Sequence, residues 1–274
     1  MSKSATSYLK NLFLDIFFPK ICVGCGRHDT WLCEKCQRQI ILIKKPFCPS
    51  CQMLNSTGSF CSRCRPKFNF TGAILAGYYH DPILKELIHG LKYRGITNLT
   101  PILARLLIPS LISHLTTPTL TEPTLRSASR PCVGIGTPTP LGVGADNGQL
   151  TTIFIPIPLH SSRRRERGFN QAELICRELK KLLTADGYRV NIIANRLVRR
   201  ANNRAQIELT HQERLENVRD IFSWRGGKLN IKAKRIFLVD DVITTGATMN
   251  EAAKTIKPHL SSNVQIWALA VAKG

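Results

Sequence analysis

Two adjacent carboxylates, Asp240 and Asp241, stand between an apolar segment and a turn rich in hydroxyl groups. The segment Ile236–Val239 has the composition of a buried parallel strand, which we expect to end where the acids begin. Met249–Ile256 has the spacing of a helix. A loop between a strand and a helix N-terminus binds anions, because unpaired backbone N–H groups and the helix dipole point at the ligand. The stretch therefore predicts a phosphate site.

The composition of this turn indicates which phosphate ligand would fit. Gly246 lets the backbone approach a ligand closely, and the hydroxyl groups beside it add donors. The predicted phosphate contacts are Thr244, Thr245, Gly246, Ala247 and Thr248. Acids beside a phosphate would repel it, so we expect Asp240 and Asp241 to hold hydroxyls of the same ligand, directly or through Mg²⁺. A sugar phosphate carries both groups. The structural alternative is a plain helix N-cap with two surface acids.

A run of arginines precedes another predicted helix. Ile153–Pro158 predicts a strand and Ala172–Leu183 predicts a helix, with a basic loop between them. Carboxyl ends of parallel strands share one edge of a sheet, so this loop should face the same crevice as the acids. The candidates for binding a diphosphate there are Arg163, Arg165 and Arg167. A solvated basic surface is the alternative.

Two segments lack the periodicity of core elements. Residues 116–150 are rich in Pro, Thr and Gly, which predicts a flexible surface insertion. Residues 196–224 are polar and charged, which predicts a lid over the crevice or an exposed helix and loop. A Walker A motif, G-x-x-x-x-G-K-[ST], occurs nowhere in the chain, which argues against a motor ATPase.

Eight cysteines form four C-x-x-C pairs, a spacing that lets two thiolates bind one tetrahedral Zn²⁺. The predicted ligands are Cys22, Cys25, Cys33, Cys36, Cys48, Cys51, Cys61 and Cys64. Four pairs imply two structural zinc ions, held either sequentially (22/25/33/36 and 48/51/61/64) or as a cross-brace. Disulfides are the alternative in an oxidising compartment. Cys132 and Cys176 are left as lone thiols.

Charge and length limit the classes of protein to which this chain could belong. The 274 residues carry a formal net charge of +21, which favours a polyanionic partner such as nucleic acid or a phosphorylated substrate. The apolar stretch Leu9–Phe18 is short and contains Asp15, so we expect neither a signal peptide nor a membrane span, and a cytoplasmic protein. We predict an amphipathic helix within 1–20, a double zinc ribbon at 21–67 and an α/β domain at 68–274 that contains the insertion 116–150.

These motifs together resemble the ComF family of competence-associated, phosphoribosyltransferase-like proteins. The resemblance covers most of the chain and adds Leu91-Lys92-Tyr93 and the Gln206…Arg214…Asn217 stretch to the motifs above. It implies a type I phosphoribosyltransferase-like fold, in which a mainly parallel sheet is flanked by helices, and an N-terminal double zinc ribbon. Two positions depart from related patterns. Asn203 stands where the family has Thr, and Thr244 stands where purine-salvage relatives often carry an Asp that can act as a base.

The resemblance implies two functions from different classes. The first is a Mg²⁺-dependent phosphoribosyltransferase linked to DNA uptake. In it, Asp240 and Asp241 hold the ribose of phosphoribosyl diphosphate (PRPP), and the three arginines stabilise the departing diphosphate. Residues Thr244–Thr248 cup the 5-phosphate, and the acceptor is unassigned. The second is a non-catalytic adaptor of the uptake machinery that binds single-stranded DNA and a competence helicase.

The cysteine pattern generates the first prediction. Metal analysis of the chain purified under reducing conditions should give two zinc ions per chain, because each pair of C-x-x-C motifs completes one four-thiolate site. A metal-free, folded chain under those conditions would contradict it.

Overall fold

The computed structural model describes residues 19–116, 151–200, 220–231 and 233–274. Several predictions fall outside the described residues. They are the amphipathic helix within 1–20, nearly all of the 116–150 insertion, Cys132 and the middle of the predicted lid, 201–219.

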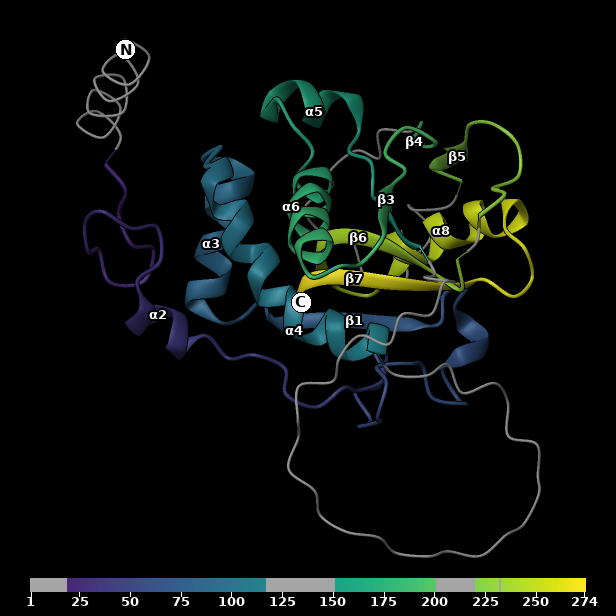
Figure 1. Ribbon diagram of the computed structural model, residues 1–274, viewed down its shortest axis with the longest axis horizontal. Coiled ribbons are helices and arrows are strands. Elements are labelled where there is room, and N and C mark those ends of the chain that lie inside the picture. Colours follow the sequence, from purple (N-terminus) through teal and green to yellow (C-terminus); the bar gives the residue numbers. More distant parts are fainter. Residues whose placement is uncertain (1–18, 117–150, 201–219, 232) are drawn as a thin grey trace, which may run out of the picture.

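A five-stranded parallel sheet forms the centre of the fold (Figure 1). Its order is β1 (Gly72–Tyr78), β7 (Gln265–Lys273), β6 (Arg235–Ile243), β2 (Thr152–Pro156) and β3 (Val190–Ile192). Every neighbouring pair in this sheet runs parallel. The central strands are apolar on both faces, as expected for strands covered by helices on both sides. The predicted mainly parallel α/β fold is confirmed.

Helices cover both faces of the sheet. One apolar cluster joins strand residues such as Phe154 and Phe237 to α3 (Pro82–Tyr93), α4 (Thr100–Thr116) and α6 (Gln171–Ala185). The alternate strand residues, such as Ile155 and Leu238, pack in a second cluster with α8 (Ala247–Ile256). Since strand side chains alternate between faces, one sheet serves both clusters.

The remaining elements are short. They are α2 (Glu34–Gln39), α5 (Ser161–Arg167), an antiparallel pair of β4 (Leu197–Arg199) and β5 (Phe222–Trp224), and 3-10 turns at Arg65–Lys67, Thr97–Leu99 and Lys257–His259.

One apolar helical stretch, Thr97–Thr116, is long enough and apolar enough to cross a membrane by length and composition. It includes α4, which packs against β1, β7 and α6. Leu103, Leu107 and Leu111 on this helix are fully buried in the first cluster. The packing of α4 on the sheet therefore accounts for its apolar character.

Segments of the cysteine-rich region, residues 22–64, cover the outer edge of the sheet at β1. The backbone N–H of Ile43 donates to Ala76 (2.8 Å), and that of Phe60 donates to Thr71 (3.0 Å). Isolated bridges join Leu42 to Gly77 and Ser59 to Gly72. An exposed edge strand would present unpaired backbone groups, so these bonds protect the edge and join the N-terminal region to the sheet.

The close approach at Gly72 generates the second prediction. A Cβ atom on Gly72 would clash with the carbonyl oxygen of Gly58 and with the Cα of Ser59. Both are backbone atoms, so Gly72→Ala should destabilise the fold by about 2 kcal/mol or more in urea unfolding. The control is Gly227→Ala, where no atom lies within 4 Å of the new methyl group. Equal stability of the two variants would contradict the close packing of the N-terminal region on β1.

Candidate functional site

The acid pair lies within β6, not after its end. Asp240 pairs with Ala270 of β7, and the β6–β7 pairing continues to Ile243. On the other side, pairing with β2 stops at Val239. The expectation that the strand ends before the acids was therefore wrong for one edge of β6, because β7 is long enough to supply partners further along. The acids stand where β6 has lost its β2 neighbour, which opens that side to a ligand.

Asp241 forms a buried ion pair with Lys92. The Nζ of Lys92 lies 2.6 Å from Oδ1 of Asp241, and the two side chains are only 17% and 8% exposed. Burial alone would lower the pKa of Lys92, but the two carboxylates outweigh it and the pKa is raised. Lys92 therefore stays charged. Sequence reasoning missed this role, although Lys92 belonged to the segment that resembles the family.

The carboxyl group of Asp240 has a pKa close to neutral pH. Burial and the neighbouring Asp241 raise its pKa to about 7, against the opposing effects of Lys92, the N–H of Asp241 and Arg199. That N–H donates to Oδ1 of Asp240 over 2.9 Å. An added cation would lower the pKa and ionise the group. The pair is thus suited to bind a divalent cation or ligand hydroxyls.

The predicted phosphate loop has the geometry of an anion site. Gly246 adopts a left-handed conformation (φ 81°) as the N-cap of α8, which begins at Ala247 rather than at Met249. Oγ1 of Thr245 accepts a hydrogen bond from the N–H of Ala247 (3.3 Å). Thr244 is exposed and Thr248 is half-buried in the first turn. Nζ of Lys273 donates to the carbonyl of Thr244 (2.7 Å), which places a cation beside the loop.

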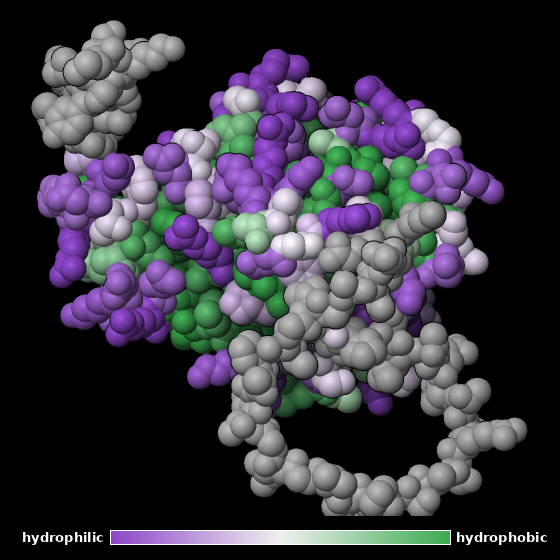
Figure 2. All heavy atoms as spheres, in the orientation of Figure 1, coloured by the Kyte–Doolittle hydropathy of each residue, from purple (hydrophilic) through white to green (hydrophobic). Residues whose placement is uncertain are grey.

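The arginine run forms the short helix α5, where a loop was expected. The side chain of His160 caps its N-terminus by accepting from the N–H of Ser162, and Gly168 ends it with φ 77°. Arginine is a good helix former, so the run between these two caps takes up helix. In Figure 2, hydrophilic residues cover the region of α5 at the top of the molecule, where Arg163 and Arg165 are exposed.

One contact and one electrostatic effect relate the α5 arginines to the acid pair. The guanidinium of Arg167 lies 5.3 Å from the centre of the Tyr93 ring, next in sequence to Lys92. Arg199 in β4 has its pKa lowered, first by burial and then by Arg163, while Asp240 opposes the shift. Arg199 therefore lies within the electrostatic reach of both groups. It was part of the segment predicted as a lid and was not singled out as a site residue.

The eight predicted zinc ligands form two clusters, and their pairing is sequential. Within each cluster the four sulfur atoms all lie within 4.8 Å of one another: Cys22, Cys25, Cys33 and Cys36 in one, and Cys48, Cys51, Cys61 and Cys64 in the other. The Cys25–Cys33 and Cys51–Cys61 sulfur distances are both 3.6 Å. Four thiolates at about 2.3 Å around a tetrahedral ion stand about 3.8 Å apart, so both clusters fit Zn²⁺.

The thiol pKa values diverge within each cluster. Burial and the neighbouring cysteines raise the pKa of Cys36 to about 12. Against a backbone hydrogen bond at Met53, the side chain of Cys48 and burial raise the pKa of Cys51 to about 11. Burial raises the pKa of Cys22 and Cys48, but nearby backbone N–H groups outweigh it and bring each to about 6. Each site therefore contains a thiol that ionises readily. The remaining described cysteine, Cys176, is buried in α6, where burial raises its pKa well above the usual value.

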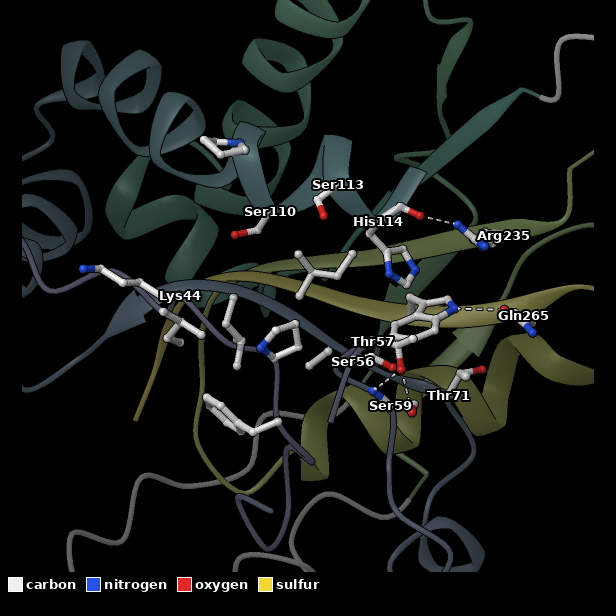
Figure 3. A pocket seen from close by; sticks show the side chains of 18 residues that line it. Lys44, Ser56, Thr57, Ser59, Thr71, Ser110, Ser113, His114, Arg235 and Gln265 are labelled. Atoms are coloured by element: carbon white, nitrogen blue, oxygen red, sulfur yellow. Dashed lines mark hydrogen bonds between the residues drawn. The ribbon is translucent and has the colours of Figure 1, made fainter. Parts of the chain in front are cut away.

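A cavity of about 520 Å³ lies apart from these groups (Figure 3). Ser110, Ser113 and His114 of α4 line one side of it. Arg235 and Gln265 line it at the first residues of β6 and β7. The acid pair lies towards the other end of β6, so this cavity is not part of the phosphate site. Burial and Arg235 lower the pKa of His114 to about 4, which keeps the imidazole neutral.

The raised pKa of Asp240 generates the third prediction. Its folded-state value of about 7 exceeds the ordinary 3.8, so the folded chain binds more protons between those limits, and this group costs stability as pH rises through them. The free energy of unfolding of Asp240→Asn, relative to wild type, should therefore increase from about pH 4 to 7 and then level off. Urea unfolding across this range measures it. A difference in unfolding free energy that does not change with pH would contradict the raised pKa of Asp240. The control is Asp186→Asn, which removes an exposed carboxylate.

Comparison with known proteins agrees with this architecture. Residues 13–65 match the double zinc ribbon domain. Competence protein F of Haemophilus influenzae is 28% identical over 261 residues, which cover 93% of this chain and 98% of that protein. DNA utilization protein YhgH of Escherichia coli K12 is 26% identical over 240 residues, 87% of this chain and 89% of the relative.

A third relative matches over a shorter region. Competence protein ComFC of Bacillus subtilis is 33% identical over 104 residues, 38% of each chain. The long matches span the cysteine clusters and the parallel sheet together, which agrees with the motifs and the fold described above. The chain is a homologue of competence protein F, and in it a double zinc ribbon precedes a mainly parallel α/β fold.

Proposed function

We propose that the protein serves DNA uptake by binding PRPP with Mg²⁺ at the open side of β6 and transferring its ribose 5-phosphate to an acceptor. The observation that carries the proposal is the placement of half-buried Asp240 and buried Asp241 next to a glycine-capped turn, with Lys92 and Lys273 beside them. Two relatives that align with most of the chain are named competence protein F and DNA utilization protein YhgH, which supports the link to DNA uptake.

Each part of the site has a role in this proposal. The N–H groups and hydroxyls of Thr244–Thr248 bind the 5-phosphate at the start of α8. Asp240 and Asp241 hold the ribose hydroxyls and the Mg²⁺ bound with them. Mg²⁺ supplies charge neutralisation for the diphosphate. The three arginines of α5, Arg163, Arg165 and Arg167, bind the departing diphosphate, and of these Arg167 lies over the ring of Tyr93.

In this proposal Lys92 also takes part in the same step, which its ion pair with Asp241 supports. In the ligand-free state its ammonium group pairs with Asp241. Asp241 would accept ribose hydroxyls, and the ammonium group of Lys92 would then be free to pair with the diphosphate. Cleavage of the bond from ribose C1 to the diphosphate leaves an oxocarbenium-like ring. Charge stabilisation and exclusion of water then matter more than a strong base, and Thr244 supplies none.

The proposal also places the protein in the cytoplasm and divides the roles between its two domains. The ionisable cysteine clusters bind zinc only while the thiols stay reduced, which suits the cytoplasm. We assign PRPP binding to residues 68–274 and a structural or docking role to the double zinc ribbon at 21–67.

The double variant Asp240→Asn/Asp241→Asn tests the role of the acid pair. It should lose Mg²⁺-dependent PRPP binding by at least about tenfold, because both charged acceptors for the ribose and the cation are removed. Isothermal titration with and without Mg²⁺ measures this loss. The folded double variant should match wild type in far-UV circular dichroism. Asp186→Asn, an exposed carboxylate at the end of α6, is the control and should bind as wild type does. Unchanged affinity in the double variant would remove the ribose-binding role.

The exposed basic residues of the cysteine-rich region favour a second candidate function, an adaptor that binds single-stranded DNA and a helicase. These residues are Lys35, Arg38, Lys44 and Lys45. They lie away from the acid pair in the sequence, and the net charge of +21 suits a polyanion.

Separate ligands distinguish the two functions. Binding of a fluorescent single-stranded oligonucleotide should be measurable at low salt and fall as salt rises, by about 0.7 log units of affinity per log unit of salt for each phosphate neutralised. Alanine at Lys35, Arg38, Lys44 and Lys45 should weaken DNA binding and spare PRPP. Alanine at Arg163, Arg165 and Arg167 should weaken PRPP binding and spare DNA binding. Equal losses of both ligands in both variants would show a single shared site.

A further inference from the structure

Three aromatic rings link the second cysteine cluster, formed by Cys48, Cys51, Cys61 and Cys64, to the rest of the fold. Phe60 precedes the zinc ligand Cys61, and its ring stacks on Phe68 with centroids 4.0 Å apart. Phe70 meets both rings edge to face, at 5.0 Å and 5.6 Å. Phe60 and Phe70 are buried in the same apolar cluster as Cys48 and Cys64. The position of this aromatic triad, Phe60, Phe68 and Phe70, is therefore tied to the second four-cysteine site.

Two rings of this triad, Phe68 and Phe70, pack against the proposed phosphate loop. A Cβ atom on Gly246 would lie 3.6 Å from Cζ of Phe70 and 3.7 Å from Cε1 of Phe68. The left-handed backbone of Gly246 thus lies directly against the two rings. Met249 and Ala253 of α8 belong to the same apolar cluster. The loop has no side chain of its own at Gly246, so the rings supply its packing there.

A pair of asparagines adds directional bonds between the same two segments. The backbone N–H of Asn69 donates to Oδ1 of Asn250 over 2.7 Å, and its side-chain amide reaches the same oxygen at 3.2 Å. The N–H of Asn250 in turn donates to the carbonyl of Gly246 (2.8 Å). The residues after the second cluster are therefore connected to the phosphate loop by hydrogen bonds as well as by packing.

The first cysteine cluster contacts a different part of the molecule. A Cβ atom on Gly24 would lie 2.7 Å from Sγ of Cys36 and 3.4 Å from Cδ1 of Ile83 in α3. Cys33 and Cys36 belong to the apolar cluster on the other face of the sheet. The two four-cysteine sites thus provide a matched comparison, because one lies against the phosphate loop and the other against α3.

We propose that the second four-cysteine site positions the phosphate loop, so that sugar-phosphate binding at Thr244–Thr248 depends on zinc in that site and not on zinc in the first. The inference rests on the proposed function and adds a metal dependence to it. A small zinc module buries little apolar surface, and its metal supplies much of its folding free energy. Without the metal, Phe68–Phe70 would lose their fixed place against Gly246 and Asn250.

The test compares one less-buried ligand from each site. Cys25→Ser and Cys61→Ser should each reduce bound zinc from two ions to one. Hydrogen exchange of amides 244–250 should quicken in Cys61→Ser and stay unchanged in Cys25→Ser. Affinity for ribose 5-phosphate, which carries no diphosphate, should fall about tenfold in Cys61→Ser and less than about twofold in Cys25→Ser. Equal effects in both variants, or no change at 244–250 in Cys61→Ser, would overturn the proposal.

Two further variants test the coupling with both zinc ions retained. Asn250→Ala removes the acceptor of both asparagine bonds, whereas Asn69→Ala keeps the backbone N–H that donates the shorter one. Hydrogen exchange of amides 244–248 should therefore quicken more in Asn250→Ala than in Asn69→Ala, and the reverse order would contradict the proposal.

If wild type binds no ribose 5-phosphate, the proposed function fails, and the exchange measurements still decide whether the second four-cysteine site positions the loop. If Cys61→Ser does not fold, Phe68→Leu takes its place, and unchanged exchange in that variant would overturn the inference.

Discussion

The site depends on one electrostatic constraint: two neighbouring carboxylates on a strand cannot both ionise in a partly buried place without cations. Lys92 meets that need for Asp241 through a 2.6 Å ion pair, and Asp240 keeps a pKa of about 7. The cations come from separate elements, since Lys92 lies in α3 and Arg199 in β4. The packing of these elements around β6 therefore determines the charge of the site. A polyanionic ligand that brings its own Mg²⁺ would satisfy the acids and the surrounding cations together.

The cysteine-rich region is joined to this arrangement at both sides of the sheet. Oδ2 of Asp81 accepts the N–H of Ile41 (2.9 Å), while its Oδ1 accepts the N–H of Leu84 and caps α3, the helix that carries Lys92. The residues after the second cluster lie against Gly246 and Asn250. At the β1 edge, Leu42 from between the two cysteine clusters and Ser59 from within the second form isolated bridges to Gly77 and Gly72. The cysteine-rich region thus contacts both α3, which carries Lys92, and the turn at Gly246 that we propose as the phosphate loop.

Local sequence patterns predicted the parts of the site that local chemistry determines. The strand, the glycine-capped turn and the helix of 236–256 form one continuous segment, and sequential cysteine pairing needs only short loops. What could not be predicted depends on distant partners. β6 runs past the acids because β7 continues beside it, and Lys92 meets Asp241 only once α3 packs on the sheet. The arginine run became helix α5 because His160 and Gly168 cap it, a local signal that the charge of the run obscured.

A crystal structure of the wild-type chain with PRPP and Mg²⁺ would locate each part of the ligand. We expect the 5-phosphate at the N–H groups of Thr244–Thr248 and the ribose hydroxyls beside Asp240 and Asp241. We also expect Nζ of Lys92 to turn from Asp241 towards the diphosphate. PRPP bound elsewhere, with the Lys92–Asp241 pair intact and the phosphate loop empty, would contradict the proposed function.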